Sequence, residues 1–287
     1  QHTEVIVSEK DFFAFIPTVI ENIESYDTTT VRASVGNYLV SKYIKENTDC
    51  KVIFNGDGAD ELMGGYLYFK NSPNAYEFDK ECKRLLRDIY MFDVLRSDKS
   101  ISSHGLEPRT PFLDRKWVET YLSISKHTRF NNTINYCEKF TIRNAFSNIM
   151  PNLLPNEILW RTKEAFSDGV SSLQKSWFEI IQEKIDNLCV KNENFLKYNL
   201  ENTIETYNNN KISNNIPKTY EQAYYRYVYN KFYKNTDHLI EYYWMPKYVD
   251  AKDASARSLK CYEENNSNSK NNITNKYNLE DKEAITL

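Results

Sequence analysis

The chain has 287 residues, which is enough for one large domain or two small ones. Hydrophobic residues make up 40% of the sequence and charged residues 27%, a balance typical of a protein with a globular core. The net charge of -3 excludes the strongly basic surface expected of a nucleic-acid-binding protein.

The five cysteines are scattered along the chain, form no C-x-x-C pair and are odd in number. A zinc site or a disulfide framework is therefore not expected, and a reducing, cytoplasmic compartment is favoured. The sequence shows no secretory signal and no apolar run of the roughly 18 residues needed to span a bilayer. We therefore expect neither a membrane nor a nucleic acid as a partner.

The first part of the chain predicts a strand and then helices. The run EVIV at residues 4–7 is short and apolar, and residues 8–25 follow with apolar side chains at helical spacing. Ser8 is placed to cap this helix, and Pro17 is placed to bend or split it. Residues 31–47 repeat the helical pattern.

Residues 51–54, KVIF, then predict a short buried strand, because the run is brief and β-branched. A glycine-rich loop follows, and another helix begins at Asp60. An amphipathic stretch follows at residues 77–98, and a compact block at residues 104–117. Helical patterns return at residues 137–150, 170–188 and 220–233, and a polar loop at residues 207–217 separates the last two. One strand–loop–helix unit among many helices indicates an α/β fold in which helices dominate.

The loop NGDGADE after the second strand has the properties of an anion site. Gly56 and Gly58 allow a tight backbone and a close approach by a ligand. The helix that follows offers free N–H groups and the positive end of its dipole, which suit a phosphate. The acids beside it favour a divalent cation such as Mg²⁺ between the protein and the phosphate.

An ordinary structural role explains the same pattern about as well. Asp57 is a common turn residue, and Asp60 and Glu61 are common acids of a first helical turn. The loop lacks the late Glu of an EF-hand and the Gly-Lys-Ser/Thr of a Walker A loop. Spacing alone therefore leaves both interpretations open.

Several motifs resemble those of glutamine-dependent asparagine synthetases, and they occur in that family's order. They are SYDTTTVRAS, NGDGADELMGGYLYFKNSPN, FDVLRSDKSISSHGLEPRTPFLD, EKFTIRNAF, RTKEAFSDGV and WMPKYVDAKDASARSLKCY. The resemblance spans residues 1–262 and implies an α/β synthetase domain of the adenine nucleotide alpha-hydrolase-like (ATP-pyrophosphatase) type. Residues 263–287 have low complexity and are expected to form a disordered tail.

Two parts of the family's pattern are not found, the S-G-G-x-D-S loop that contacts ATP and the N-terminal glutaminase domain with its leading Cys. Gln1 also opens directly into the run HTEVIV. The chain is therefore interpreted as a synthetase domain that is truncated at its N-terminus, with part of its parallel sheet missing. We expect residues 1–287 to be inactive by themselves and the full-length protein to be active.

The resemblance implies that the full-length protein makes L-asparagine from L-aspartate. ATP activates aspartate as β-aspartyl-AMP with release of pyrophosphate, and ammonia from glutamine then displaces AMP. ATP is thus implied as a substrate, Mg²⁺ as its companion ion, and a homodimer as the assembly of the full-length protein.

Within the glycine loop, the resemblance places Asn55 and Gly56 against ATP and Gly58 on the pyrophosphate side. It implies that Asp57 acts in formation of the adenylate, and that Asp60 helps to hold Mg²⁺ and pyrophosphate. Asn55 and Asp57 stand where the family has Ser and Glu. The shorter arm of Asp57 matters because a displacement of about 1 Å in a catalytic group can cost roughly 100-fold in rate.

Lys163 in RTKEAFSDGV stands at the position of the family's catalytic lysine. Its implied role is to stabilise the charge that develops on the α-phosphate and the substrate carboxylate. Arg161 is a further candidate for phosphate binding on the same resemblance. Without the motif, a lone lysine in a loop is most often a solvated charge.

Further candidates lie between these two motifs. Glu107 and Arg109 share one face of an extended segment, either as a buried pair in which Glu107 assists catalysis or as a structural ion pair. Arg96, Lys99 and Arg109 are the candidates for the substrate side of the site. Arg96 and Lys99 are expected to bind the substrate carboxylate or the nucleotide, and surface charge is the alternative for these two residues. Asp114 is expected to cap the next helix rather than to act in catalysis.

Two other functions remain open beside asparagine synthesis. One is a sibling amide-forming ligase that adenylates another carboxylate. The other is a non-catalytic, degenerate homologue that binds nucleotide or a partner. The segments PFLD, FSDGV and DASAR favour asparagine synthesis, whereas Asn55 and Asp57 are the sequence support for a degenerate protein.

Overall fold

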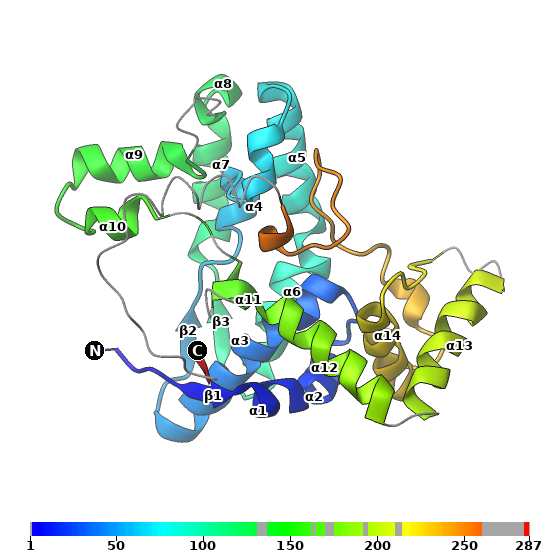
Figure 1. Cartoon of the computed structure of the whole chain (residues 1–287). Helices are drawn as coiled ribbons and strands as arrows, with labels where there is room; N and C mark the ends of the chain where they lie inside the picture. The colour runs from blue at the N-terminus through cyan, green and yellow to red at the C-terminus, as the bar shows by residue number, and fades with distance from the viewer. Residues whose placement is uncertain are drawn as a thin grey trace.

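The computed structural model describes residues 2–130, 137–161, 163, 165–169, 175–191, 195–209, 214–259 and 284–286. Helices dominate these residues, and the strands among them are short (Figure 1). Figure 1 shows α12, α13 and α14 grouped on one side, and α9 and α10 standing apart on the other. The helix-rich fold with a small parallel sheet that the sequence predicts is thus confirmed.

The first half of the chain contains β1 (Ile6–Ser8), α1 (Glu9–Ala14), α2 (Ile16–Ile23), α3 (Thr28–Asn47), β2 (Val52–Phe54), α4 (Ala59–Met63), α5 (Ala75–Asp88), α6 (Asp93–Ser102) and β3 (Glu107–Arg109). The second half contains α7 (Arg115–Ser123), α8 (Lys126–Arg129), α9 (Phe140–Ile149), α10 (Asn156–Leu159), α11 (Phe166–Gly169), α12 (Trp177–Lys191), α13 (Phe195–Asn209), α14 (Tyr220–Phe232) and β4 (Ala284–Thr286). Short 3-10 helices occur at Leu67–Asn71, Ile89–Met91, Pro111–Leu113, Asp237–Leu239 and Ala256–Ser258.

The predicted cap and break near the N-terminus are both confirmed. The hydroxyl of Ser8 accepts a hydrogen bond from the N–H of Asp11 at 3.1 Å and so caps α1. The helix is interrupted at Phe15, and Pro17 lies in the first turn of α2. A proline is tolerated there because its missing N–H would have no partner within the helix.

The parallel sheet joins β2 to β3, with Val52 opposite Glu107 and Phe54 opposite Arg109. The predicted strand at KVIF is confirmed, but the prediction that it is buried is wrong. Val52 is 43% exposed and Phe54 is 75% exposed. Within the described ranges this sheet has two strands. Apolar strands are buried in wide parallel sheets that helices cover on both faces, and a sheet of two strands leaves more of its side chains exposed.

A second pairing is antiparallel and joins β1 to β4, with Ile6 opposite Thr286. Residues 260–283 and 287, which make up most of the tail expected to be disordered, lie outside the described residues. The disorder of residues 263–287 therefore stays a prediction.

Several boundaries differ from the sequence pattern. The amphipathic stretch 77–98 breaks into α5 and α6, because a 3-10 helix at Ile89–Met91 changes the direction of the chain. Helix α13 extends to Asn209 and so enters the segment expected to be a polar loop, of which residues 210–213 lie outside the described residues. Residues 170–174, the expected start of a helix, also lie outside them, and α12 begins at Trp177.

Helices in the described ranges fall short of the length and apolarity needed to cross a bilayer. The described cysteines are all free thiols, namely Cys50, Cys82, Cys137 and Cys189.

The largest apolar cluster lies where α1, α2 and α3 meet α12, α13 and α14. Phe12, Trp177 and Tyr225 are fully buried in it, and the ring of Phe12 meets the ring of Trp177 edge-on with centroids 4.5 Å apart. Burial of a large apolar side chain contributes about 1.5–3 kcal/mol. This cluster therefore holds α3 firmly against the C-terminal helices.

Arg32 on α3 joins three distant segments through buried ion pairs. Its guanidinium donates to Glu221 on α14 at 2.8 and 2.6 Å, and to Asp253 in the C-terminal segment at 2.8 Å through each of two nitrogens. Burial of Arg32 alone would lower its pKa, but the carboxylates of Glu221 and Asp253 outweigh burial and raise it. The segments TTTVRAS and DASAR are therefore brought together by charge as well as by packing.

Asp27 fixes the start of α3. Its carboxylate accepts from the N–H of Thr30 at 2.9 Å, which caps the helix, and from the N–H of Trp244 at 2.8 Å. The side chain is fully buried, and this burial raises its pKa to about 6 although both hydrogen bonds oppose the shift. The bond to Trp244 carries the C-terminal segment to the first turn of α3.

Asp27→Asn tests this cap through the pH dependence of stability. The pKa of Asp27 is about 6 in the fold and 3.8 without it, so the fold favours the protonated form. The contribution of Asp27 to the free energy of unfolding is therefore greatest below about pH 4. It falls by about 3 kcal/mol at most as the pH rises through 6. We expect the free energy of unfolding of Asp27→Asn, measured with urea, not to fall over this pH range. Parallel stability–pH curves for the variant and the wild type would contradict the expectation.

Candidate active site

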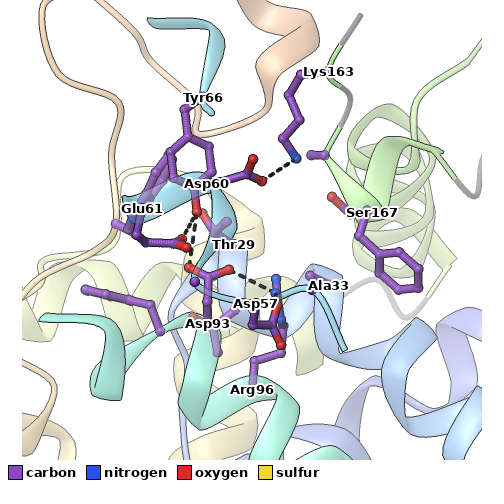
Figure 2. A pocket seen from close by; sticks show the side chains of 17 residues that line it. Thr29, Ala33, Asp57, Asp60, Glu61, Tyr66, Asp93, Arg96, Lys163 and Ser167 are labelled. Atoms are coloured by element: carbon purple, nitrogen blue, oxygen red, sulfur yellow. Dashed lines mark hydrogen bonds and ion pairs between the residues drawn. The ribbon is translucent and has the colours of Figure 1, made fainter. Parts of the chain in front are cut away.

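A cavity of about 140 Å³ lies between the first turns of α3 and α4, beside the glycine loop. Figure 2 shows Lys163 reaching Asp60 at one end, and Asp93, Asp57 and Arg96 gathered at the other. Ligand sites in proteins usually enclose roughly 300–1,000 Å³. The cavity between α3 and α4 is smaller than this range.

The glycine loop is a tight turn held against β3. Asn55 donates its backbone N–H to the carbonyl of Arg109 at 2.9 Å, and its side-chain oxygen accepts from the N–H of Asp57 at 3.1 Å. Gly58 has φ +89°, and a Cβ there would lie 2.3 Å from a methyl of Leu113, so a glycine is required. The side chain of Asn55 thus braces the turn, and the predicted contact of Asn55 with ATP stays a prediction.

Asp60 binds two lysines at the first turn of α4. Nζ of Lys139 lies 2.5 Å from Oδ1, and Nζ of Lys163 lies 3.0 Å from Oδ2. Burial alone would raise the pKa of Asp60, but Lys163 and Lys139 together outweigh it and hold that pKa well below its usual range. Asp60 is therefore ionised at neutral pH, and the structure brings it together with Lys163.

Beside Asp60 the cavity is lined by further acids. Glu61 is 3% exposed and accepts a hydrogen bond from the hydroxyl of Tyr66, which also lies 3.3 Å from a carboxylate oxygen of Asp93. Burial raises the pKa of Glu61 well above its usual value, and the charges of Asp93 and Asp60 raise it further. A cation brought to this end of the cavity would relieve the repulsion between these acids.

Arg96 on α6 is the cation that the fold places here. One of its terminal nitrogens lies 2.7 Å from Asp57 and 2.9 Å from Asp93, and its side chain is 11% exposed. Burial would lower the pKa of Arg96, but the charges of Asp93 and Asp57 outweigh burial and raise it. The short carboxylate of Asp57 is therefore held by an ion pair at the edge of the cavity.

Three further lining residues come from other motifs. Thr29 in the first turn of α3 has a hydroxyl oxygen that is buried and finds no hydrogen-bond partner within the described part of the chain. Trp244 reaches the cavity from the C-terminal segment, and Ser167 reaches it from α11. The hydroxyl of Thr29 is thus available to a ligand.

Sequence reasoning did not single out the lining residues Thr29, Tyr66, Asp93 and Trp244. It also did not single out Lys139, which pairs with Asp60 but is absent from the cavity lining. The signal was present, because each of them lies inside one of the quoted family motifs. Their spacing alone could not show that these motifs meet at one cavity.

Other predicted candidates lie away from the cavity lining. Glu107 and Arg109 form an ion pair, as their shared face predicts, but they are 57% and 59% exposed, so the expectation of a buried pair is wrong. Their strand lies at the surface because β3 belongs to the same narrow sheet as β2. The geometry therefore favours a structural pair over a catalytic role for Glu107.

Lys99 points from α6 to Glu24, with Nζ 2.7 Å from a carboxylate oxygen, and is absent from the cavity lining. Arg161 is exposed and is likewise absent from that lining. The carboxylate of Asp114 accepts from the N–H of Trp117 at 3.1 Å, which confirms the predicted cap of α7.

The side chains around Asp60 offer few ligands for a metal ion. Groups of three or more His, Cys, Asp or Glu suited to hold an ion are not found in the described residues. Mg²⁺ bound with phosphates usually takes one or two carboxylates and completes its shell with phosphate oxygens and water. Asp60 is ionised and 21% exposed, which fits the role of such a single carboxylate ligand.

The glycine loop at the carboxyl end of a parallel strand thus lies at one cavity with Lys163, Arg96 and several acids. The sequence model of the family described as asparagine synthase matches residues 1–78 and 70–219. The chain therefore belongs to the asparagine synthase family.

Individual relatives agree with this family. The chain is 46% identical over 262 residues to the "Asparagine synthetase [glutamine-hydrolyzing]" of Gallus gallus, and 43% identical over 262 residues to the protein of that name from Homo sapiens. Each match covers 91% of this chain and 44% of the relative. The chain thus spans less than half the length of these curated relatives.

Gly65→Ala tests how Asp60 is positioned. A Cβ on Gly65 would lie 2.0 Å from Oδ1 of Asp60 and 2.8 Å from its Cα, so the side chain of Asp60 must move away from its lysines. We expect urea unfolding to show a loss of about 1–3 kcal/mol. Gly56→Ala is the control, because a Cβ there meets no atom within 4 Å, and its stability should stay within about 0.5 kcal/mol of wild type. Equal stability of the two variants would contradict the close contact.

Proposed function

We propose that the full-length protein that carries this domain forms L-asparagine from L-aspartate and ATP, and that the cavity is part of its adenylating site. Family membership and the names of the relatives support the reaction. The observation that carries the assignment of the cavity is the Asp60 carboxylate with Lys163 and Lys139 on its two oxygens, beside the glycine loop.

The proposed reaction has two steps. An oxygen of the β-carboxylate of aspartate attacks the α-phosphorus of ATP, a new O–P bond forms, and pyrophosphate leaves with the electrons of the bond that breaks. Ammonia then attacks the acyl carbon, and AMP leaves with the former carboxylate oxygen while the nitrogen loses a proton. Negative charge gathers on the phosphates in the first step, where a fixed cation such as Lys163 stabilises it.

Mg²⁺, when bound, would offset part of the charge of pyrophosphate, and Asp60 is the proposed protein ligand. The pyrophosphate side of the site is assigned to the backbone of Gly56 and Gly58. The parallel pair of β2 and β3, with this loop at the end of β2, supports the proposal of an adenine nucleotide alpha-hydrolase-like fold.

Aspartate is proposed to bind with its ammonium group at the acidic end of the cavity. Glu61, Asp93 and the hydroxyl of Tyr66 offer acceptors there. The β-carboxylate would then point toward Lys163. Asp57, held by Arg96, is the proposed acceptor for the proton that the attacking ammonia loses.

Other properties of the full-length protein are proposed on the family relation. Ammonia would come from glutamine in a separate domain, the location would be cytoplasmic, and the protein would be a homodimer. The free thiols of the described cysteines support a reducing compartment. The alternatives of a sibling ligase or a degenerate homologue are not favoured, because the relatives carry the name asparagine synthetase.

Lys163→Ala in the full-length protein tests the assignment of the catalytic lysine. Removal of a fixed cation that stabilises developing charge typically costs about 100- to 1,000-fold in rate. We expect asparagine formation to fall by at least this factor, while the hydrolysis of glutamine continues. The matched control is Lys45→Ala near the far end of α3, which should form asparagine at the wild-type rate. Wild-type synthesis by Lys163→Ala would refute the role of Lys163.

A further inference from the structure

Glu138 is a buried acid that the proposed reaction does not use. It lies next to the N-cap of α9, is 4% exposed and is absent from the cavity lining. Burial raises the pKa of its carboxyl, although hydrogen bonds and nearby cations lower it. Taking a carboxyl group out of water costs free energy, so the contacts that compensate for this cost show what the residue holds in place.

Arg143 joins Glu138 to the far end of one arm, which is formed by α9 and α10 and stands away from the rest of the fold in Figure 1. The guanidinium of Arg143 lies 3.1 Å from the carboxylate of Glu138 and donates to the carbonyl of the same residue at 2.9 Å. It also donates to the carbonyl of Leu159, the last residue of α10. The carboxylate of Glu138 thus lies where the two ends of the arm meet.

The same carboxylate reaches the backbone of Lys163, just after the end of α10. It accepts a hydrogen bond from the N–H of that residue. The described residues between α10 and α11 have no regular secondary structure, so the hydrogen bonds of a helix or a strand do not fix this backbone. Glu138 therefore supplies an anchor that the secondary structure does not.

Lys163 is thus held at both ends. Its Nζ lies 3.0 Å from Oδ2 of Asp60, as Figure 2 shows, and its backbone N–H is bonded to Glu138. A lysine has a flexible four-carbon stem, so the ammonium group is placed accurately only when the backbone that carries it is fixed. Accuracy matters because a displacement of about 1 Å in a catalytic group can cost roughly 100-fold in rate.

We propose that Glu138 is a positioning residue, which holds the backbone of Lys163 so that the ammonium group reaches the cavity. The inference rests on the proposed function, because it concerns the lysine that is assigned to charge stabilisation. Glu138 touches no substrate and acts through Lys163. The alternative is a pair of Glu138 and Arg143 that stabilises the arm and has no part in the reaction.

The test measures asparagine formation by the full-length protein from aspartate, ATP and ammonium chloride, so that the rate does not depend on glutamine hydrolysis. Glu138→Ala removes the acceptor for the N–H of Lys163, whereas Glu138→Gln keeps an acceptor oxygen at the same reach. The matched control is Glu81→Ala. Glu81 is also buried and pairs with an arginine, Arg84, at 2.7 Å, but it is absent from the cavity lining.

We expect the kcat of Glu138→Ala to fall by about 30- to 100-fold, and that of Glu138→Gln by less than about tenfold. Glu81→Ala should keep a kcat within about threefold of wild type, although it also loses a buried ion pair and is destabilised. Equal losses of kcat in the two alanine variants, or a wild-type kcat in Glu138→Ala, would overturn the proposal.

A positioning residue loses its effect when the residue that it positions is removed. In the Lys163→Ala background, Glu138→Ala should therefore change kcat by less than about threefold. In the Lys139→Met background it should keep its full effect, although the neighbouring Lys139 also pairs with Asp60. Additive losses with Lys163→Ala, or disappearance of the effect with Lys139→Met, would show that Glu138 does not act through Lys163.

Hydrogen exchange tests the anchor without activity. In the full-length protein, we expect the amide of Lys163 to exchange about tenfold faster in Glu138→Ala than in wild type, and at the wild-type rate in Glu81→Ala. An unchanged rate in Glu138→Ala would sink the anchor. Faster exchange in Glu138→Ala, in a full-length protein that makes no asparagine, would refute the proposed function and leave the anchor in place.

Discussion

The geometry of the candidate active site depends on one carboxylate. Asp60 begins α4 directly after the glycine loop, and it holds Lys139 and Lys163 through separate oxygens. Gly65 packs against Asp60 so closely that there is no room for a side chain at position 65. Without Asp60, two ammonium groups would face each other across a partly buried space, and like charges at short range are costly. Asp60 therefore lets the fold keep the ammonium groups of Lys139 and Lys163 close together.

The cavity has a second charged end that is built from different segments. Arg96 pairs with Asp57 and Asp93 there, while Glu61 accepts a hydrogen bond from the hydroxyl of Tyr66. Each end of the cavity thus pairs acids with cations. Arg32 on α3 forms buried ion pairs with Glu221 on α14 and with Asp253 in the C-terminal segment. Breaking a buried ion pair is costly, so these pairs keep the segments that line the cavity in place.

The features that the sequence predicts correctly are local. The caps at Ser8 and Asp114 and the break beside Pro17 each follow from residues within a few positions of one another. The contacts that make the site are not local, and the pair of Lys139 with Asp60 is the plainest case. The motifs predict that such residues matter, but the side chain that each one meets follows from the packing of distant helices. The exposure of β2 was missed for the same reason, since burial of a strand depends on its neighbours.

The most direct measurement of the central claim follows oxygen from aspartate. The full-length protein is given ATP, glutamine and aspartate labelled with ¹⁸O in its β-carboxylate, and the AMP that forms is examined by mass spectrometry. Activation of the carboxylate as an adenylate predicts one ¹⁸O transferred to the phosphate of AMP for each asparagine made. Unlabelled AMP, or label that appears in inorganic phosphate alongside ADP, would contradict an adenylating site in this family member.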